Sequence, residues 1–175
     1  SHHDFDAYMV SVVGDEGTNF VGNPRVFDWS SLKGHTVLSH NASFDETLYL
    51  FGVRKKWWSK VQPAEWHCTA DLAVFCGLPR SLKGATGELF DLEISKETRN
   101  NMMGKRWEEM TPEFKTEVSD YALLDSELCL RLWKELQTRW PQKERDISRV
   151  NRKSVQRGIP IDIALLKKQQ ENYLD

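Results

Sequence analysis

Apolar residues in the first part of the chain gather in short runs separated by turn residues. Runs of this length, bounded by Gly, Pro, Asn and Asp, are typical of β-strands. The turn Gly14-Asp15-Glu16-Gly17 between the first two runs predicts a β-hairpin. The predicted strands span Tyr8–Val13, Thr18–Val21, Thr36–Ser39 and Ala64–Cys68.

Other apolar residues recur at helical spacing. Between Glu113 and Trp140 they fall three or four residues apart, which predicts one or two long helices ended by Pro141. Thr111-Pro112-Glu113 is a strong helix start, because Pro suits the first helical position and an acidic residue suits the first turn. The other predicted helical segments are Phe27–Leu32, Ser43–Phe51 (ended by Gly52), Thr69–Phe75, Ser81–Leu89 with Ser81 as N-cap, Glu144–Gln156 and Ile163–Leu174, and residues 93–109 are predicted to be an irregular polar loop.

Strands alternating with helices predict an α/β fold. The 175 residues, 39% of them hydrophobic and seven of them Trp, suffice for one packed domain with a short appendage. A net charge of -2 excludes a general basic surface for duplex DNA, although it allows a nuclease with an acidic, metal-binding cleft.

The compartment follows from the cysteines and from the missing targeting signals. Cys68, Cys76 and Cys129 show neither metal-ligand spacing nor an even disulfide framework, so we expect a reducing intracellular environment. No apolar run approaches the ~20 residues of a membrane span, and no signal peptide is visible. We therefore predict a cytoplasmic protein without a membrane partner.

Two motifs carry candidate chemistry. His40-Asn41-Ala42-Ser43-Phe44-Asp45 lies where a strand gives way to a helix, so Asp45 projects from the first helical turn. Tyr121 and Asp125 are four residues apart, on one face of a predicted helix. Two carboxylates and a phenol are suited to holding a divalent metal ion and a water for phosphodiester hydrolysis. The structural alternatives are a carboxylate favoured by the helix dipole for Asp45 and simple core packing for Tyr121. Asp120 and Glu127, on the same predicted helix as Asp125, are expected to face solvent.

These motifs resemble the 3′–5′ exonuclease domain of the DEDD superfamily, in its tyrosine variant, as found in family A DNA polymerases of bacteriophages. Residues 40–45 resemble the second acidic motif of that superfamily, and Tyr121 with Asp125 resembles the third. The segments at 68–73 and 77–82 are similar to the stretch that follows a central strand, and 157–162 is similar to the passage into a polymerase domain. The resemblance covers roughly residues 8 to 175 and implies a ribonuclease H-like three-layer fold, with a mixed sheet flanked by helices and a helical C-terminal extension.

The resemblance also implies roles. Asp45 and Asp125 would hold a pair of Mg²⁺ or Mn²⁺ ions, and Tyr121 would orient the attacking water. Asn41 and Phe44 would border the terminal nucleotide of single-stranded or 3′-frayed DNA. The implied activity is proofreading, the metal-dependent hydrolysis of the terminal phosphodiester of DNA in a bacterial or phage-infected cell.

One acidic motif of the family, Asp-x-Glu on a first strand, is not found. Asp4 and Asp6 have its spacing and are candidate stand-ins, with solvated residues of a frayed terminus as the alternative. We expect either that an N-terminal piece precedes this sequence or that the chain cannot cut. The alternative function is therefore an inactive exonuclease-like module that serves DNA binding or polymerase docking.

The resemblance divides the chain into an exonuclease-like domain at 1–140 and a helical extension at 141–175, where the sequence stops inside a helical pattern as at a fragment boundary. His40 and His67 are expected to be hydrogen-bonded near the core and not to be metal ligands. Trp57 and Trp58 follow three basic residues, and this cluster is predicted either to stack on bases or to pack on the domain. Basic residues around the polar loop are either a guide for a single strand or a solvated surface: Lys96, Arg99, Lys105 and Arg106.

Overall fold

The computed structural model of the chain describes residues 6–92, 101–102 and 105–174. The predictions for Asp4, Lys96 and Arg99, and most of the predicted 93–109 loop, lie outside these residues. Within them the chain is an α/β protein, which confirms the predicted class.

The strands that the structure describes form two separate pairs. β1 (Val10–Val13) pairs antiparallel with β2 (Asn19–Gly22), which confirms the predicted hairpin. β3 (Thr36–Ser39) pairs in parallel with β4 (Glu65–Cys68) through a crossover that contains a helix, as parallel pairing requires. Both kinds of pairing of a mixed sheet are therefore present, but these residues do not join into one continuous sheet.

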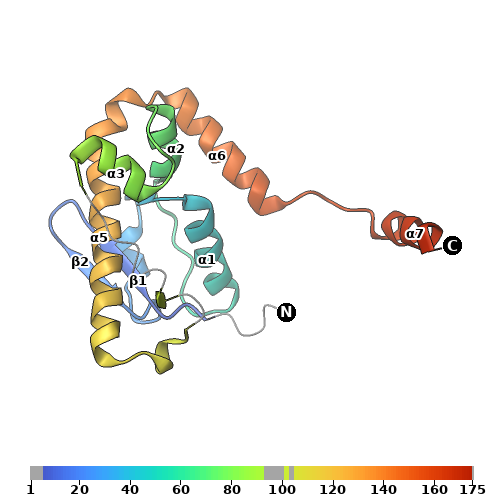
Figure 1. The fold of residues 1–175 in the computed structure, drawn as a ribbon, viewed down its shortest axis with the longest axis horizontal. Coiled ribbons are helices and arrows are strands. Elements are labelled where there is room, and N and C mark those ends of the chain that lie inside the picture. The colour runs from blue at the N-terminus through green and yellow to red at the C-terminus, as the bar shows by residue number, and fades with distance from the viewer. Residues whose placement is uncertain (1–5, 93–100, 103–104, 175) are drawn as a thin grey trace.

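Helices make up most of the rest of the described chain (Figure 1). Their bounds are α1 (Ala42–Arg54), α2 (Thr69–Phe75), α3 (Leu82–Phe90), α5 (Pro112–Leu136), α6 (Gln142–Arg157) and α7 (Ile163–Leu174), with 3₁₀ turns η2 (Trp29–Leu32), η3 (Trp107–Glu109) and η4 (Gln137–Arg139). The predicted N-cap Ser81 is confirmed, since its Oγ accepts a hydrogen bond from the amide of Gly84. The predicted helix start at 111–113 is confirmed too, and there Thr111 Oγ1 accepts a hydrogen bond from the amide of Phe114.

The predicted end of the first long helix at Gly52 is wrong. α1 continues to Arg54, and Gly52 lies inside it, buried against the ring of Trp58. A Cβ at Gly52 would lie 1.9 Å from Cζ2 of Trp58. This glycine therefore serves close packing, because its missing side chain leaves room for the indole.

The main core lies where α5 meets α2 and α3. Its fully buried members come from all three helices and from the segment just after α5: Leu72, Ala73, Ala85, Leu132, Leu136 and Trp140. α5 also contacts β1, β2 and β3, so one long helix packs against both strand pairs. A smaller cluster of Ala42, Cys68 and Ala70 lies where β4, α1 and α2 meet, directly beneath the start of α1.

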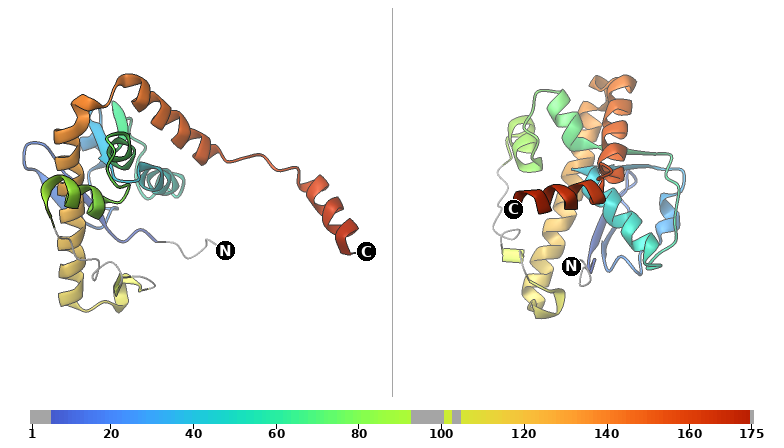
Figure 2. Two further views of the ribbon diagram at one scale, coloured as in Figure 1. Left: turned by 45° about the horizontal axis from the view of Figure 1, so that its top comes forward. Right: turned by 90° about the vertical axis from the view of Figure 1, so that its right-hand side faces the viewer.

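The segment after Pro141 divides into two parts. α6 packs on α1 and β4. Every described residue from 157 to 173 is exposed, and α7 extends away from the body at the end of an extended linker (Figure 1 and the left view of Figure 2). Among the described residues, none of the helices combines the length and apolar character needed to cross a bilayer.

Candidate active site

Asp45 is delivered by a tight passage from β3 into α1. β3 ends at Ser39, and Asn41 adopts the left-handed region with φ 71° and ψ 50° just before the helix begins. Asn tolerates this conformation better than other residues with a Cβ. The Asn41 carbonyl accepts a hydrogen bond from the amide of Phe44 at 3.0 Å, while its side chain makes no capping bond. Asp45 therefore lies in the first helical turn, as predicted.

The carboxyl group of Asp45 is exposed on one side and crowded by protein on the other. Desolvation by the surrounding protein raises its pKa to about 6, although a hydrogen bond from the backbone at the helix start opposes the rise. The favourable helix-terminus effect is thus present but smaller than the cost of desolvation. A carboxyl group in this state gains from a nearby cation, since positive charge favours its ionised form.

Tyr121 and Asp125 lie one turn apart on α5, as predicted, because the helix is continuous from Pro112 to Leu136. Both are half-buried, and both take part in interactions with the rest of the protein. Asp120 and Glu127 on the same helix are exposed, which confirms the prediction that they face solvent. The helix therefore turns Tyr121 and Asp125 toward the body of the protein.

The thiol of Cys129 lies near both candidate carboxylates. Burial raises the pKa of Cys129 to about 12, and the negative charges of Asp45 and Asp125 both add to the rise. Such an effect requires both carboxylates to be close to the same buried sulfur atom. The fold thus brings both acidic motifs near one buried side chain.

A chain of hydrogen bonds connects the elements that carry these carboxylates. His40 Nε2 lies 2.8 Å from the carbonyl oxygen of Arg80, so Nε2 must donate there, because a carbonyl only accepts. Burial lowers the pKa of His40, so its neutral ring leaves Nδ1 to accept from Thr69 Oγ1 at 3.1 Å. Thr69 Oγ1 in turn accepts from the protonated Cys129 Sγ at 3.2 Å. The turn before α1, the start of α2 and the middle of α5 are linked in this way.

The two histidines behave as predicted, as hydrogen-bonded groups near the core. His67 Nε2 lies 3.0 Å from Glu65 Oε2, and its ring stacks on Trp133 with centroids 4.8 Å apart. Thr69 and Cys129 are the site residues that sequence reasoning missed. For Cys129 a signal existed, since it lies one turn after Asp125 on the same helical face.

The candidate substrate residues lie at the surface. Asn41 is exposed, and Phe44, the residue before Asp45, is 59% exposed. Trp58 packs on the domain, because it stacks on Trp29 and its Nε1 donates to the carbonyl oxygen of Tyr49. Trp57 lies under the guanidinium of Arg25, 4.3 Å from the ring centroid. The packing alternative for this cluster therefore holds for Trp58.

The other predicted charged residues have ordinary surface positions. Lys105 and Arg106 are exposed, and Lys105 Nζ lies 4.7 Å from the centroid of Phe114. Asp6, the described member of the stand-in pair, forms an exposed ion pair of 2.7 Å with Arg25. Over residues 6–92, 101–102 and 105–174, three or more His, Cys, Asp or Glu side chains do not gather closely enough to hold a metal ion.

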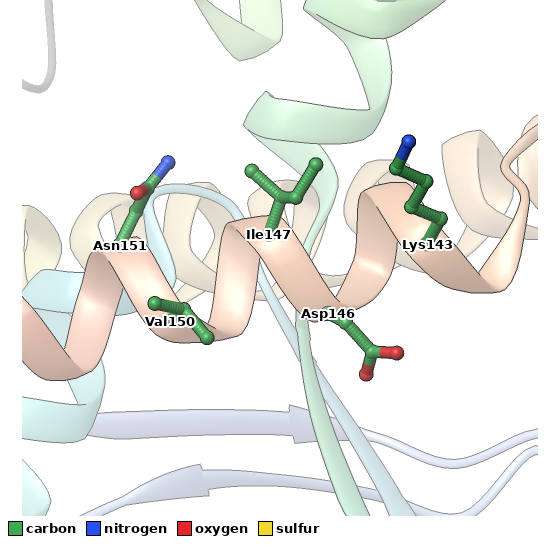
Figure 3. A pocket seen from close by; sticks show the side chains of 5 residues that line it. All are labelled: Lys143, Asp146, Ile147, Val150 and Asn151. Carbon is green, nitrogen blue, oxygen red and sulfur yellow. The ribbon is translucent and has the colours of Figure 1, made fainter.

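Two cavities of the described chain lie away from these carboxylates. One of about 310 Å³ is lined by residues from the start of the described chain, β2, η3 and α5, including Asp6, Tyr8 and Trp107. Another is a shallow hollow on the outer face of α6, formed by Lys143, Asp146, Ile147, Val150 and Asn151 (Figure 3). Comparison of the chain with protein families, characterised proteins and solved structures gives no significant match.

Proposed function

We propose that this chain is the 3′–5′ exonuclease domain of a phage-type DNA polymerase, hydrolysing the terminal phosphodiester of DNA. The observation that carries the proposal is the convergence of Asp45 and Asp125 on the thiol of Cys129, with Tyr121 one turn before Asp125. Both acidic motifs lie within electrostatic reach of one buried thiol, and a metal-dependent hydrolytic site requires its carboxylates to be near one another.

The proposed ribonuclease H-like architecture accounts for the two strand pairs. β1, β2 and β3 all pack against α5, so both pairs contact the same helix. We propose that a further strand between β1 and β3 joins them into a single mixed sheet. Such a strand would also bring the missing first acidic motif, Asp-x-Glu, beside Asp45 and Asp125.

The donor set fits Mg²⁺ or Mn²⁺ as part of a site. Both ions prefer carboxylate oxygens, and the raised pKa of Asp45 marks a carboxyl that a cation would stabilise in its ionised form. Asp45 and Asp125 are the residues that would hold the metal. When bound, the metal supplies a nucleophilic water and positive charge for the leaving oxygen.

The protein's own side chains would do the rest. Tyr121 would form a hydrogen bond with the attacking water and hold this water in line with the terminal phosphorus. The exposed Phe44 would make apolar contact with the terminal nucleotide, and the side chain of Asn41, which makes no capping bond, would border it. Positioning of this kind lowers the barrier by replacing a random encounter with a fixed geometry.

The test uses 5′-labelled single-stranded DNA with Mn²⁺ or Mg²⁺. We expect stepwise shortening that is lost in Asp45→Ala and Asp125→Ala and reduced in Tyr121→Phe. Asp120→Ala is the matched control, because Asp120 is an exposed carboxylate on the same helix. Intact substrate under every metal condition would contradict the proposal for this chain.

The second candidate is an inactive module that binds DNA, and the exposed Phe44 beside Asn41 supports it equally. The same labelled DNA distinguishes the two functions. Binding that weakens in Phe44→Ala without any cleavage would favour the module, whereas metal-dependent shortening would favour the enzyme.

A further inference from the structure

Arg152 on α6 is buried against the body of the protein, with only 6% of the residue exposed. One of its terminal nitrogens, Nη2, donates to the carbonyl oxygen of Trp66 in β4, and Nη1 donates to Ser148 Oγ at 2.9 Å. A buried guanidinium is costly unless it is paired and hydrogen-bonded. The buried position of Arg152 therefore depends on these hydrogen bonds, and loss of Arg152 would leave its partners without them.

The charged partner of Arg152 is Glu46, the residue directly after Asp45. Arg152 Nε lies 3.5 Å from Glu46 Oε2, at ion-pair distance, and makes no other polar contact. Glu46 is largely shielded from solvent, with 22% of its side chain exposed, so water screens this pair less than a surface pair. The first turn of α1 is thereby tied to α6 next to the candidate metal ligand.

A second route leads from the same anchor to the turn before α1. Ser148 Oγ, which accepts from Arg152, donates to Asp71 Oδ2 at 2.5 Å. Asp71 Oδ1 pairs with Arg80 Nη1 at 2.9 Å, and the Arg80 carbonyl accepts from His40. α6 therefore reaches both sides of the passage that carries Asn41 and Asp45.

We propose that Arg152 is a positioning residue for Asp45, so that α6 is a structural part of the candidate metal site. Through Glu46 and through the Ser148–Asp71–Arg80–His40 route, α6 holds the first turn of α1 against β4. The consequence for metal binding rests on the proposed function, while the positioning itself does not.

Hydrogen exchange tests the positioning without any substrate. In Arg152→Met we expect the amides of residues 46–48, which close the first turn of α1, to exchange at least ~10-fold faster relative to the amides around Leu132 in α5. Glu46→Gln should give a smaller change of the same sign, and it keeps the test open if Arg152→Met fails to fold. Arg149→Met is the matched control, since Arg149 lies on the same helix in an exposed pair with Asp146. An unchanged ratio in both Arg152→Met and Glu46→Gln would overturn the proposal.

Metal dependence of DNA shortening supplies the second readout. We expect the Mn²⁺ concentration for half-maximal rate to rise about 10-fold or more in Arg152→Met, with a smaller change in the rate at saturating Mn²⁺ and partial rescue in Arg152→Lys. An unchanged Mn²⁺ requirement in an active protein would count against the proposal. If the wild-type protein cuts no DNA, the proposed function fails, and the exchange measurement alone decides whether Arg152 positions α1.

Discussion

α5 and α6 are consecutive helices that are held in place by opposite kinds of contact. α5 buries an apolar stripe that includes Val118, Leu128 and Leu132. α6 instead buries Ser148 and Arg152 and leaves two of its apolar residues on the outer face, Ile147 at 42% and Val150 at 57% exposure (Figure 3). Hydrophobic periodicity thus locates the buried face of α5 and misplaces that of α6.

The difference has an energetic meaning. Apolar burial is non-directional and grows with the area removed from water, so α5 tolerates small shifts. The α6 contacts are directional, and each buried polar group that loses its partner keeps its desolvation cost. We therefore expect α5 to contribute most of the free energy of unfolding. We expect α6 to fix the position of the first turn of α1.

The largest effect is expected from Leu132→Ala in α5. Leu132 is fully buried in the main core, so the cavity left behind should cost about 2–5 kcal/mol in the free energy of unfolding. Urea denaturation measures this cost. Leu124→Ala is the control on the same helix, because Leu124 is 39% exposed, and a similar loss in both variants would break the comparison.

A smaller loss is expected from Ser148→Ala in α6. This change removes the hydroxyl that joins Arg152 to Asp71, leaving two charged groups each short of one hydrogen bond, for a cost of about 1–2 kcal/mol. Ser154→Ala, at an exposed position of α6, should cost much less. Equal stability of the two variants would show that α6 is not held by its polar contacts.

The pH dependence of stability should single out Asp45, the residue before Glu46, which pairs with Arg152 of α6. Because its pKa rises to about 6 on folding, the folded protein binds this proton more tightly than the unfolded chain does. Asp45 therefore lowers stability as the pH rises from about 4 through 6, and has no such effect below about pH 4. Asp45→Asn should equal the wild type near pH 4 and exceed it at pH 7.

The gain in Asp45→Asn should stay within about 1 kcal/mol, since solvent reaches one side of the carboxyl. Urea denaturation at pH 4 and at pH 7 measures it, with Asp120→Asn as the exposed control. A difference between Asp45→Asn and wild type that is the same at both pH values would contradict the raised pKa.

The smallest effect is expected from Ile147→Ser on the outer face of α6. Ile147 is exposed, so the change should alter the free energy of unfolding by no more than ~0.5 kcal/mol. Val118→Ser, at a fully buried position of α5, should cost at least ~2 kcal/mol. A large loss in Ile147→Ser would mean that the outer face of α6 is covered by other parts of the protein in solution.

Local physics made much of this molecule predictable from sequence. The hairpin follows from a glycine-bounded turn, and the start of α5 follows from Thr111 and Pro112, because turn and cap preferences depend on neighbouring residues alone. Local sequence also predicts that Asp45 lies in a first helical turn and that Tyr121 and Asp125 lie one turn apart on α5. Helical spacing also predicted that Asp120 and Glu127 face solvent.

Only the tertiary structure decided what depends on distant contacts. The raised pKa of Asp45 comes from desolvation by packed neighbours, and its convergence with Asp125 on Cys129 comes from the docking of α5. From sequence alone Gly52 is typical of a helix end, but in the fold it makes room for the ring of Trp58. The docking face of α6 could not be derived from periodicity, because a buried arginine is stabilised by Glu46 and by the Trp66 carbonyl, partners that no local pattern identifies.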